Sequence, residues 1–285
     1  MHSNKKTPLI TIITSVLNGE EYLEKTIESV INQTAKNQIE YIIIDGNSKD
    51  GTVKIIEKYD KQINYWISET DTGVYSAWNK ALKQAHGEWI CFIGADDYFC
   101  STNTIEQVIP YLNQALPTYR VVYGKTLLIN NEQIIATRGK PWQEIEKQFI
   151  QEMCIPHRST FHHRSLFQEH GNFNPELKIS GDYDFLLREL RHNKAYFADI
   201  NLVCARLGGL SLNSNYMLTT AQERKIIRKS NNMALTRQDY ILLLKVNTVW
   251  FLHKILGKNF TINLLDSYRQ LLGKEKMWQY VTKKN

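Results

Sequence analysis

Apolar runs that alternate with helix-like segments constrain the fold of this chain more than any other feature. The runs "PLITIITSVL", "IEYIIID", "INYWISE" and "EWICFIGADD" are rich in β-branched and aromatic residues and are typical of strands. The intervening "EEYLEKTIESVINQT" and "VKIIEKYD" are predicted helices, and "DTGVYSAWNKALKQAHG" is predicted to be a loop that leads into a helix ending at Gly87. Because the strands are apolar throughout, the pattern predicts an α/β fold whose mostly parallel sheet carries helices on both faces.

Polar side chains follow each of the four predicted strands. The carboxyl ends of parallel strands meet at one edge of a sheet, where ligands bind in open α/β folds. Four separate strand ends that carry carboxylates or hydroxyls therefore predict one binding rim, whereas a single such end would indicate a solvated loop. The residues concerned are Thr14, Ser15, Asn18, Asp45, Glu69, Asp71, Asp96 and Asp97.

Two adjacent carboxylates, Asp96 and Asp97, end the run "CFIGADDYF". Neighbouring like charges repel, and each carboxylate that leaves water needs a positive partner. Either the pair is solvated, or it holds a cation, and hard oxygen ligands suit Mg²⁺ or Mn²⁺. The chain has neither GxGxxG nor GxxxxGK[ST], so the glycine loops of dinucleotide and P-loop sites are missing. A nucleotide held by other means stays open, with Asp45 accepting from a base or a ribose hydroxyl and with Asp96 and Asp97 holding a divalent cation that bridges a diphosphate.

The regular alternation of predicted strands and helices ends at about Thr104. A helix over Thr104–Gln114 precedes "RVVYGKTLLIN" and "QIIATRG", which are predicted antiparallel strands, and a further helix opens at Gly181–Asp184. After "AYFADINLVCARLGG" the chain is predicted to be helical. We therefore expect a main domain over residues 1–211, divided into a nucleotide-binding half (1–100) and an acceptor half (101–211), and a helical extension over residues 212–285. Four scattered cysteines without a CxxC pair indicate reduced thiols and a cytoplasmic protein.

Positive charge is concentrated in the C-terminal extension. Residues 220–285 hold 13 Lys and Arg against 4 Asp and Glu, a net +9, so residues 1–219 carry −3 of the overall +6. This distribution argues against a nucleic-acid groove in the main domain. The segment "YILLLKVNTVWFLHKILGKNF" is too polar to span a bilayer. It is expected to lie peripherally on an anionic membrane, to pack on the main domain, or to form a homodimer interface.

Four segments in order resemble the family 2 glycosyltransferases. They are "ITIITSVLNGEEYLEKTIESVINQ", "EYIIIDGNSKDGT", "ISETDTGVYSAWNKALKQAHGEWICFIGADD" and "SGDYDFLLRE", and the resemblance covers about Pro8 to Arg188. It implies the Rossmann-like GT-A fold and an inverting transfer of sugar from a nucleotide diphosphate sugar, with a UDP-sugar expected and Mn²⁺ or Mg²⁺ as cofactor. The segments look most like those of bacterial transferases that build capsule, O-antigen or exopolysaccharide. The implied acceptor is a glycan or a lipid-linked oligosaccharide.

The resemblance also implies roles for single residues. "GDYD" matches the segment that supplies the catalytic base, so Asp182 is the expected base, although Gly181 stands where a Glu is usual; a first-turn helix acid is the alternative role. "GADD" matches the metal-binding segment, with Gly94 in place of its first Asp. The implied donor contacts are Thr14, Ser15, Asn18, Asp45, Asp71, Gly73, Asn79 and Asp96, and the implied metal ligands are Asp96, Asp97 and His157.

Three neighbouring side chains have both a functional and a structural interpretation. Arg158, like His157, is expected near the diphosphate or the metal, but His157 is as well explained as a partly buried histidine. Tyr75, next to the rim, is a candidate to stack on the base, and Trp78 is expected in the core.

Two other functions stay open from the sequence. A nucleotidyltransferase would share the sheet and the metal carboxylates, but it would need a basic glycine loop over a triphosphate, and residues 1–100 have none. A binding or scaffold module that has lost catalysis is favoured by Gly94 and Gly181, which stand where the family often has acids.

Overall fold

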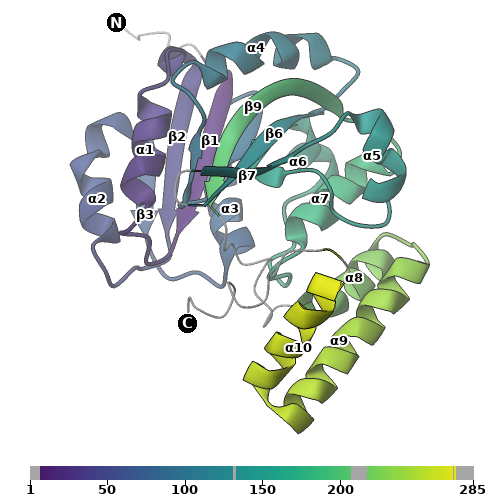
Figure 1. Ribbon diagram of the computed structural model, residues 1–285. Coiled ribbons are helices and arrows are strands. Elements are labelled where there is room, and N and C mark those ends of the chain that lie inside the picture. The colour runs from purple at the N-terminus through teal and green to yellow at the C-terminus, as the bar shows by residue number, and fades with distance from the viewer. Residues whose placement is uncertain (1–6, 131–132, 207–216, 272, 274–285) are drawn as a thin grey trace, which may run out of the picture. The chain divides into compact units, whose positions relative to one another are not determined.

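The computed structural model describes residues 7–130, 133–206, 217–271 and 273. The chain forms two compact units, Met1–Leu207 and Gly208–Asn285. The first unit contains a single mixed sheet with helices on both faces, which confirms the predicted α/β, GT-A-like fold, and the described residues of the second form three helices (Figure 1).

The sheet of the first unit has nine described strands in the order β3-β2-β1-β4-β8-β6-β9-β5, with β7 paired to β6. Strands β1 to β4 are mutually parallel, as predicted, and β6 is parallel to β9, while β8, β5 and β7 run antiparallel to their neighbours. The strands are β1 (Ile10–Val16), β2 (Ile39–Asp45), β3 (Tyr65–Ser68), β4 (Trp89–Phe92), β5 (Asp97–Phe99), β6 (Val121–Asn130), β7 (Gln133–Arg138), β8 (Thr160–His163) and β9 (Tyr196–Arg206).

Alternating side chains let each strand fill two cores. On β1, Ile10 and Ile12 face one cluster with buried residues of α1, α2 and α4, and on β4 Phe92 packs on rings of α3 and α6 at the other face. The helices are α1 (Leu23–Ile31), α2 (Thr52–Lys58), α3 (Val74–Leu82), α4 (Thr104–Ala115), α5 (Trp142–Phe149), α6 (Ser165–His170) and α7 (Gly181–Leu190). Short 3₁₀ turns are η1 (Lys36–Gln38), η2 (Asp60–Gln62) and η3 (His157–Ser159).

Helix α3 ends earlier than the sequence predicts. It stops at Leu82, and its last N–H groups bond three residues back, at Gln84 N–H to the Ala81 carbonyl. The expected stop at Gly87 was wrong, because Gly87 serves a different purpose. A Cβ atom on Gly87 would lie 2.4 Å from the backbone nitrogen of Thr11, so glycine lets this segment pass directly against β1.

The second unit contains α8 (Met217–Ser230), α9 (Arg237–Leu256) and α10 (Lys258–Leu271). Helix α9 begins with a capping box: Thr236 Oγ1 accepts from the Asp239 N–H, and the Asp239 carboxylate accepts from the Thr236 N–H. Arg228 of α8 donates to the same carboxylate at 3.1 Å, which ties α8 to α9. Among the described residues, no helix combines the length and the apolar character needed to cross a membrane.

Candidate active site

The carboxyl end of β2 carries Asp45, which is fully buried. Its Oδ1 accepts from the hydroxyl of Ser48 at 2.5 Å, and its Oδ2 accepts from the Ser68 hydroxyl at 2.5 Å and from the N–H groups of Asn47 and Ser48. These four hydrogen bonds shape the turn after β2 and fasten it to β3. The role of Asp45 in holding a nucleoside stays a prediction.

At the end of β1, one polar side chain faces the core and the next two lie toward the rim. Thr14 is buried and its hydroxyl lies 3.2 Å from that of Tyr41, so Thr14 faces the interior. Ser15, one residue on, accepts from the indole N–H of Trp78 at 3.1 Å. Asn18, in the left-handed conformation at φ 52°, accepts from the Lys49 N–H and so joins the β1 and β2 loops.

The loop before α3 is shaped by a carboxylate and a glycine. Asp71 Oδ1 accepts from the Gly73 N–H at 2.9 Å, and Gly73 has a φ of 135°, which favours glycine. The other oxygen of Asp71 lies beside Gly46, where an added Cβ would approach it to 3.1 Å. Asp71 is thus brought to the end of β2, as the rim prediction requires.

Asn79 of α3 is held by backbone rather than directed at the rim. Its amide donates to the Phe173 carbonyl at 2.8 Å and its oxygen accepts from the Phe173 N–H at 3.1 Å. This pair of bonds anchors the loop that precedes α7 to α3. A donor contact for Asn79 stays a prediction.

Asp97 opens β5 and is buried beside a cation of the protein itself. Arg158 of η3 donates from Nη1 to Asp97 Oδ1 at 2.7 Å, and the Gly94 N–H donates to Oδ2 at 3.2 Å. Burial raises the pKa of Asp97 to about 6, against the lowering effect of Arg158, and the charge of Asp96 raises it further. Arg158, which the sequence associated with a diphosphate, therefore supplies the positive partner that Asp97 needs.

The missing acid at Gly94 has a structural explanation. A Cβ atom at this position would lie 2.6 Å from Asp97 Oδ2 and 3.1 Å from Asp96 Oδ1. The carboxylates of the two following residues therefore fill the space that a side chain at position 94 would take. Asp96 is half-buried, and it is the member of the pair that is not fixed to Arg158.

The residues present fit a divalent cation held by one protein carboxylate. No group of three His, Cys, Asp or Glu side chains that could hold a metal occurs among the described residues. Mg²⁺ is often bound by one or two carboxylates together with substrate phosphates and water, and a donor set built on Asp96 suits that mode. Asp97 has one oxygen engaged by Arg158 and the other by the Gly94 N–H, so its role as a metal ligand stays a prediction.

His157 lies beneath the rim, stacked on aromatic rings. Its centroid is 5.0 Å from that of Trp78 and 5.7 Å from that of Phe92, at interplanar angles of 19° and 22°. Its Nε2 is buried and, among the described residues, has no hydrogen-bond partner. Burial, with the neighbouring His162 and Arg158, holds the pKa of His157 well below its usual value, so the ring is neutral. Its role as a metal ligand stays a prediction.

Asp182 is the second residue of α7 and is half-buried. Its Oδ1 accepts from the Tyr183 N–H at 2.8 Å and, more weakly, from the Tyr75 hydroxyl at 3.4 Å. Burial raises the pKa of Asp182 to about 6, against lowering contributions that include Tyr75 and the charge of Arg158. Asp184, two residues on, pairs with Arg188 and has the structural role on this helix.

The ring of Tyr75 fills the space beside Gly181. A Cβ atom on Gly181 would lie 2.7 Å from the Tyr75 ring, which is itself buried, stacks on Phe173 and donates to the Ile179 carbonyl at 2.8 Å. The expectation that Tyr75 stacks on a base was therefore wrong, since its ring is inside the protein. Sequence reasoning missed its contact with Asp182, although a glycine in place of a glutamate was a signal that a bulky neighbour fills the gap.

Contacts link these residues into one constellation across the sheet edge. Trp78, expected in the core, is only half-buried, and it connects Ser15 of β1 to His157. Arg158 contacts Asp97 and influences Asp182 by its charge. The structure thus joins the ends of β1 and β4 to the start of α7 through α3 and η3, as far as the described residues show.

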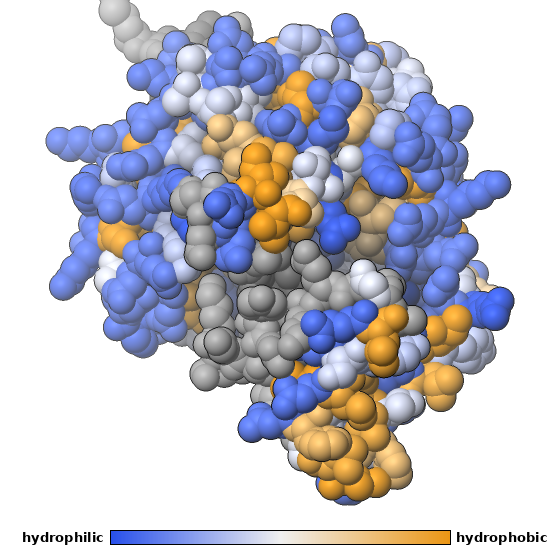
Figure 2. Space-filling model, viewed as in Figure 1, coloured by the Kyte–Doolittle hydropathy of each residue, from blue (hydrophilic) through white to orange (hydrophobic). Residues whose placement is uncertain are grey.

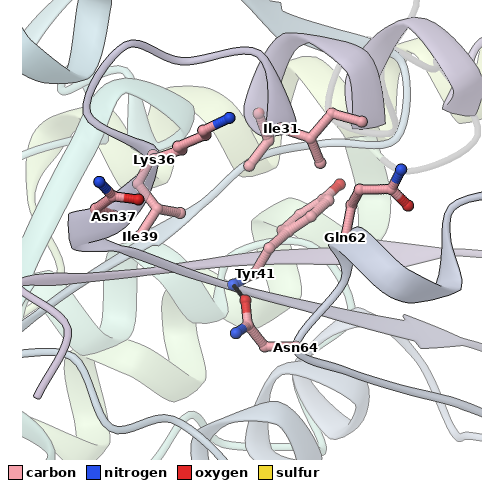
Figure 3. Close-up of a pocket in the computed structure, with 8 residues that line it drawn as sticks. Ile31, Lys36, Asn37, Ile39, Tyr41, Gln62 and Asn64 are labelled. Carbon is pink, nitrogen blue, oxygen red and sulfur yellow. Dashed lines mark hydrogen bonds between the residues drawn. The ribbon is translucent and has the colours of Figure 1, made fainter. Parts of the chain in front are cut away.

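A pocket of about 280 Å³ lies elsewhere (Figure 3). Ile39 and Tyr41, from the first half of β2, line it with Lys36, Gln62 and Asn64. Asp45 ends the same strand, so this pocket is at the opposite edge of the sheet from the candidate site.

Comparison with known proteins matches residues 11–169 to the family model "Glycosyl transferase family 2". An uncharacterised glycosyltransferase of Rickettsia typhi is 30% identical over 262 residues, which cover 90% of this chain and 81% of that protein. A PGL/p-HBAD biosynthesis glycosyltransferase of Mycobacterium bovis is 27% identical over 210 residues, covering 72% of this chain and 79% of that protein.

Solved structures share the fold at lower identity. The mannosyltransferase PcManGT from Pyrobaculum calidifontis, in complex with GDP-Man and Mn²⁺, superposes with a TM-score of 0.62 at 15% identity, covering 96% of this chain and 83% of that one. S. aureus TarS 1–349, in complex with UDP-GlcNAc, gives 0.61 at 19% identity over 83% of this chain and 71% of that one. The family model covers more than half of the chain, and we conclude that this protein belongs to glycosyl transferase family 2 and is a glycosyltransferase (EC 2.4) that uses a nucleotide-sugar donor.

Proposed function

We propose that the protein transfers a sugar, with inversion at the anomeric carbon, from a nucleotide diphosphate sugar to a hydroxyl of a glycan or lipid-linked oligosaccharide. The observation that carries this proposal is Asp182, a half-buried carboxylate whose pKa is raised to about 6 at the same sheet edge as Asp96. A group that is ionised at neutral pH and accepts a proton readily is suited to deprotonate an attacking hydroxyl.

The donor end of the site is proposed to form at Asp96. A Mn²⁺ or Mg²⁺ ion held by Asp96 would neutralise the charge that develops on the departing nucleoside diphosphate. The rim residues Ser15 and Asp71 are the proposed contacts of the nucleoside, with Asp45 and Asn18 fixing the two loops on which they depend. A UDP-sugar is the proposed donor. The UDP-GlcNAc bound by S. aureus TarS supports this, and the GDP-Man bound by PcManGT is the alternative to test.

The acceptor is proposed to belong to cell-envelope polysaccharide synthesis on the cytoplasmic side of the membrane. The relative named for PGL/p-HBAD biosynthesis supports an envelope glycoconjugate. The domain assignment proposed with this function is a transferase domain over residues 1–211 and a basic helical extension over residues 212–285, through which the protein associates with a membrane or with a second copy.

A donor screen tests the proposal. Purified protein is incubated with UDP-, GDP- and dTDP-sugars with Mn²⁺, Mg²⁺ or EDTA, and release of nucleoside diphosphate is measured with and without a panel of glycolipid acceptors. We expect metal-dependent release from one donor class, and an inverted linkage in the product by NMR. In a parallel reaction with a nucleoside triphosphate and a sugar phosphate, release of pyrophosphate as the nucleoside monophosphate group passes to the sugar phosphate would instead identify a nucleotidyltransferase. Thermal stabilisation by a donor without any turnover would identify a binding module.

A further inference from the structure

Helix α9 presents an uncovered apolar stripe. Tyr240, Leu244, Phe251 and Ile255 are 61%, 69%, 57% and 61% exposed. Their spacing of 4, 7 and 4 residues places them within one face of a helix. The buried residues of α9, Asp239 and Val246, lie on another face, so the stripe is not the side by which α9 packs in its own unit.

Helix α10 repeats the arrangement. Phe260, Leu264, Tyr268 and Leu271 are 59%, 45%, 60% and 84% exposed, and their spacing of 4, 4 and 3 residues again defines one face. Figure 2 shows apolar side chains gathered over α9 and α10. A soluble surface seldom keeps so many large apolar side chains together unless something covers them.

The charges of this unit are sorted by sign. Its acids within residues 217–271 are Glu223, Asp239 and Asp266, and they are only 4%, 2% and 1% exposed. The exposed charged residues in the same range are all basic: Lys225, Lys229, Arg237, Lys245 and Lys254. The described part of the unit therefore offers the outside an apolar and cationic surface without exposed carboxylates.

This combination fits an anionic bilayer better than a protein partner. The buried core of a protein interface is depleted of charge, yet Lys254 is exposed on the same helix as the stripe, with its ammonium 5.3 Å from the centre of the exposed Trp250 ring. Lysine stems and tyrosine or tryptophan rings have apolar bodies and polar ends, which suit the headgroup region. Basic residues next to such rings gain from anionic headgroups.

We propose that the α9–α10 hairpin binds the surface of an anionic phospholipid bilayer, with Phe251 and Phe260 in the headgroup–acyl boundary and Lys254 at the headgroups. The helices lie on the membrane, because neither could cross it. Exposure and charge alone assign this partner to the second unit, independently of the transferase reaction.

Vesicle sedimentation of the full-length protein tests the proposal. Vesicles of phosphatidylcholine are compared with vesicles that contain phosphatidylglycerol as 30% of the lipid. We expect binding to the anionic vesicles, at least a tenfold weaker partition for Phe251→Ser/Phe260→Ser, and about a fivefold weaker partition for Lys254→Gln, the factor for about 1 kcal/mol per basic residue. Ile134→Ser on β7 is the matched control, since Ile134 is 61% exposed but lies in the other unit, and it should bind as wild type does.

Three results would overturn the proposal. The first is unchanged binding of the double variant. The second is a stable dimer by light scattering that does not sediment with vesicles, which would assign the stripes to a second copy. The third is a marked fall in melting temperature of the double variant without any vesicle binding of the wild type, which would assign them to packing within the chain. Donor hydrolysis without acceptor is measured on every variant, so a failed membrane proposal is distinguished from a failed transferase proposal.

Discussion

The candidate site of the first unit keeps two acids partly accessible, whereas the described residues of the second unit have no accessible acid. In the first unit, Asp96 and Asp182 are half-buried at the sheet edge, and burial raises the pKa of Asp182 to about 6. In the second unit every acid of residues 217–271 is buried, and Asp239 is held by Arg228 and by its own helix cap. The comparison teaches that an acid left accessible at some energetic cost points to chemistry, whereas a fully paired acid points to structure.

The largest effect on activity is expected for Asp182→Asn. Loss of a general base typically lowers kcat by 10²–10⁴-fold. Asp184→Asn, on the same helix, is the control: it loses an ion pair with Arg188 but should keep turnover within about threefold. Steady-state kinetics measures the turnover of both variants. An equal loss of activity in the two would contradict the contrast between Asp182 as the base and Asp184 as a structural acid.

The next effect is expected for Asp96→Asn. Removing the one carboxylate of the pair not held by Arg158 should weaken metal-dependent donor use, with kcat/KM falling about 10–100-fold and the Mn²⁺ requirement rising. Titration of activity with Mn²⁺ measures this. A variant that saturates at the wild-type Mn²⁺ concentration would show that Asp96 does not hold the cation.

Acid should inactivate the enzyme over a definite range. The pKa of Asp182 is raised from 3.8 to about 6, so kcat/KM should fall about tenfold for each pH unit below 6 as the base is protonated. The pKa of Asp97 is also raised to about 6, and the two raised pKa values make the stability of the fold depend on pH. Between pH 4 and 6 the folded state binds more protons than the unfolded state, so the contribution of both groups to stability decreases as pH rises through that range. Paired pH profiles of rate and melting temperature measure both effects, and a flat rate between pH 5 and 7 would exclude Asp182 as the base.

A smaller effect is expected for Gly181→Ala. The added Cβ would meet the Tyr75 ring at 2.7 Å, and the adjustment should cost about 1–3 kcal/mol of unfolding free energy and lower turnover by about tenfold or less. Chemical denaturation of the single variant and of the same change in a Tyr75→Leu background measures the coupling. Equal costs in the two backgrounds would show that Tyr75 is not what requires glycine at this position.

The smallest effect on turnover is expected in the second unit. Asp239→Asn removes the charge opposite the buried Arg228, so the helical unit should lose about 3–5 kcal/mol of stability while donor hydrolysis stays at the wild-type rate. Melting curves and initial rates test this contrast. A tenfold loss of hydrolysis would mean that the second unit takes part in catalysis after all.

Much of the first unit could be predicted because its strands are short, apolar and bounded by polar turns. The end of β2 at Asp45 and the start of α7 at Gly181 follow from such local patterns. Side-chain direction at the rim could not be predicted, and neither could partners distant in sequence. Thr14 faces the core because alternation turns it away from Ser15, and the pairing of Asp97 with Arg158 depends on a contact between β5 and η3 that no local pattern encodes.

Strand β5 has a consequence for how the protein can be made. It carries Asp97 but pairs with β9, where Asp97 stands opposite Ala205, about a hundred residues later. During synthesis, the loop with Asp96 lacks its supporting strand until Arg206 has left the ribosome. The first hundred residues are therefore not a self-contained ligand-binding module, and a fragment that stops before Tyr196 should contain the donor-site sequence without its scaffold.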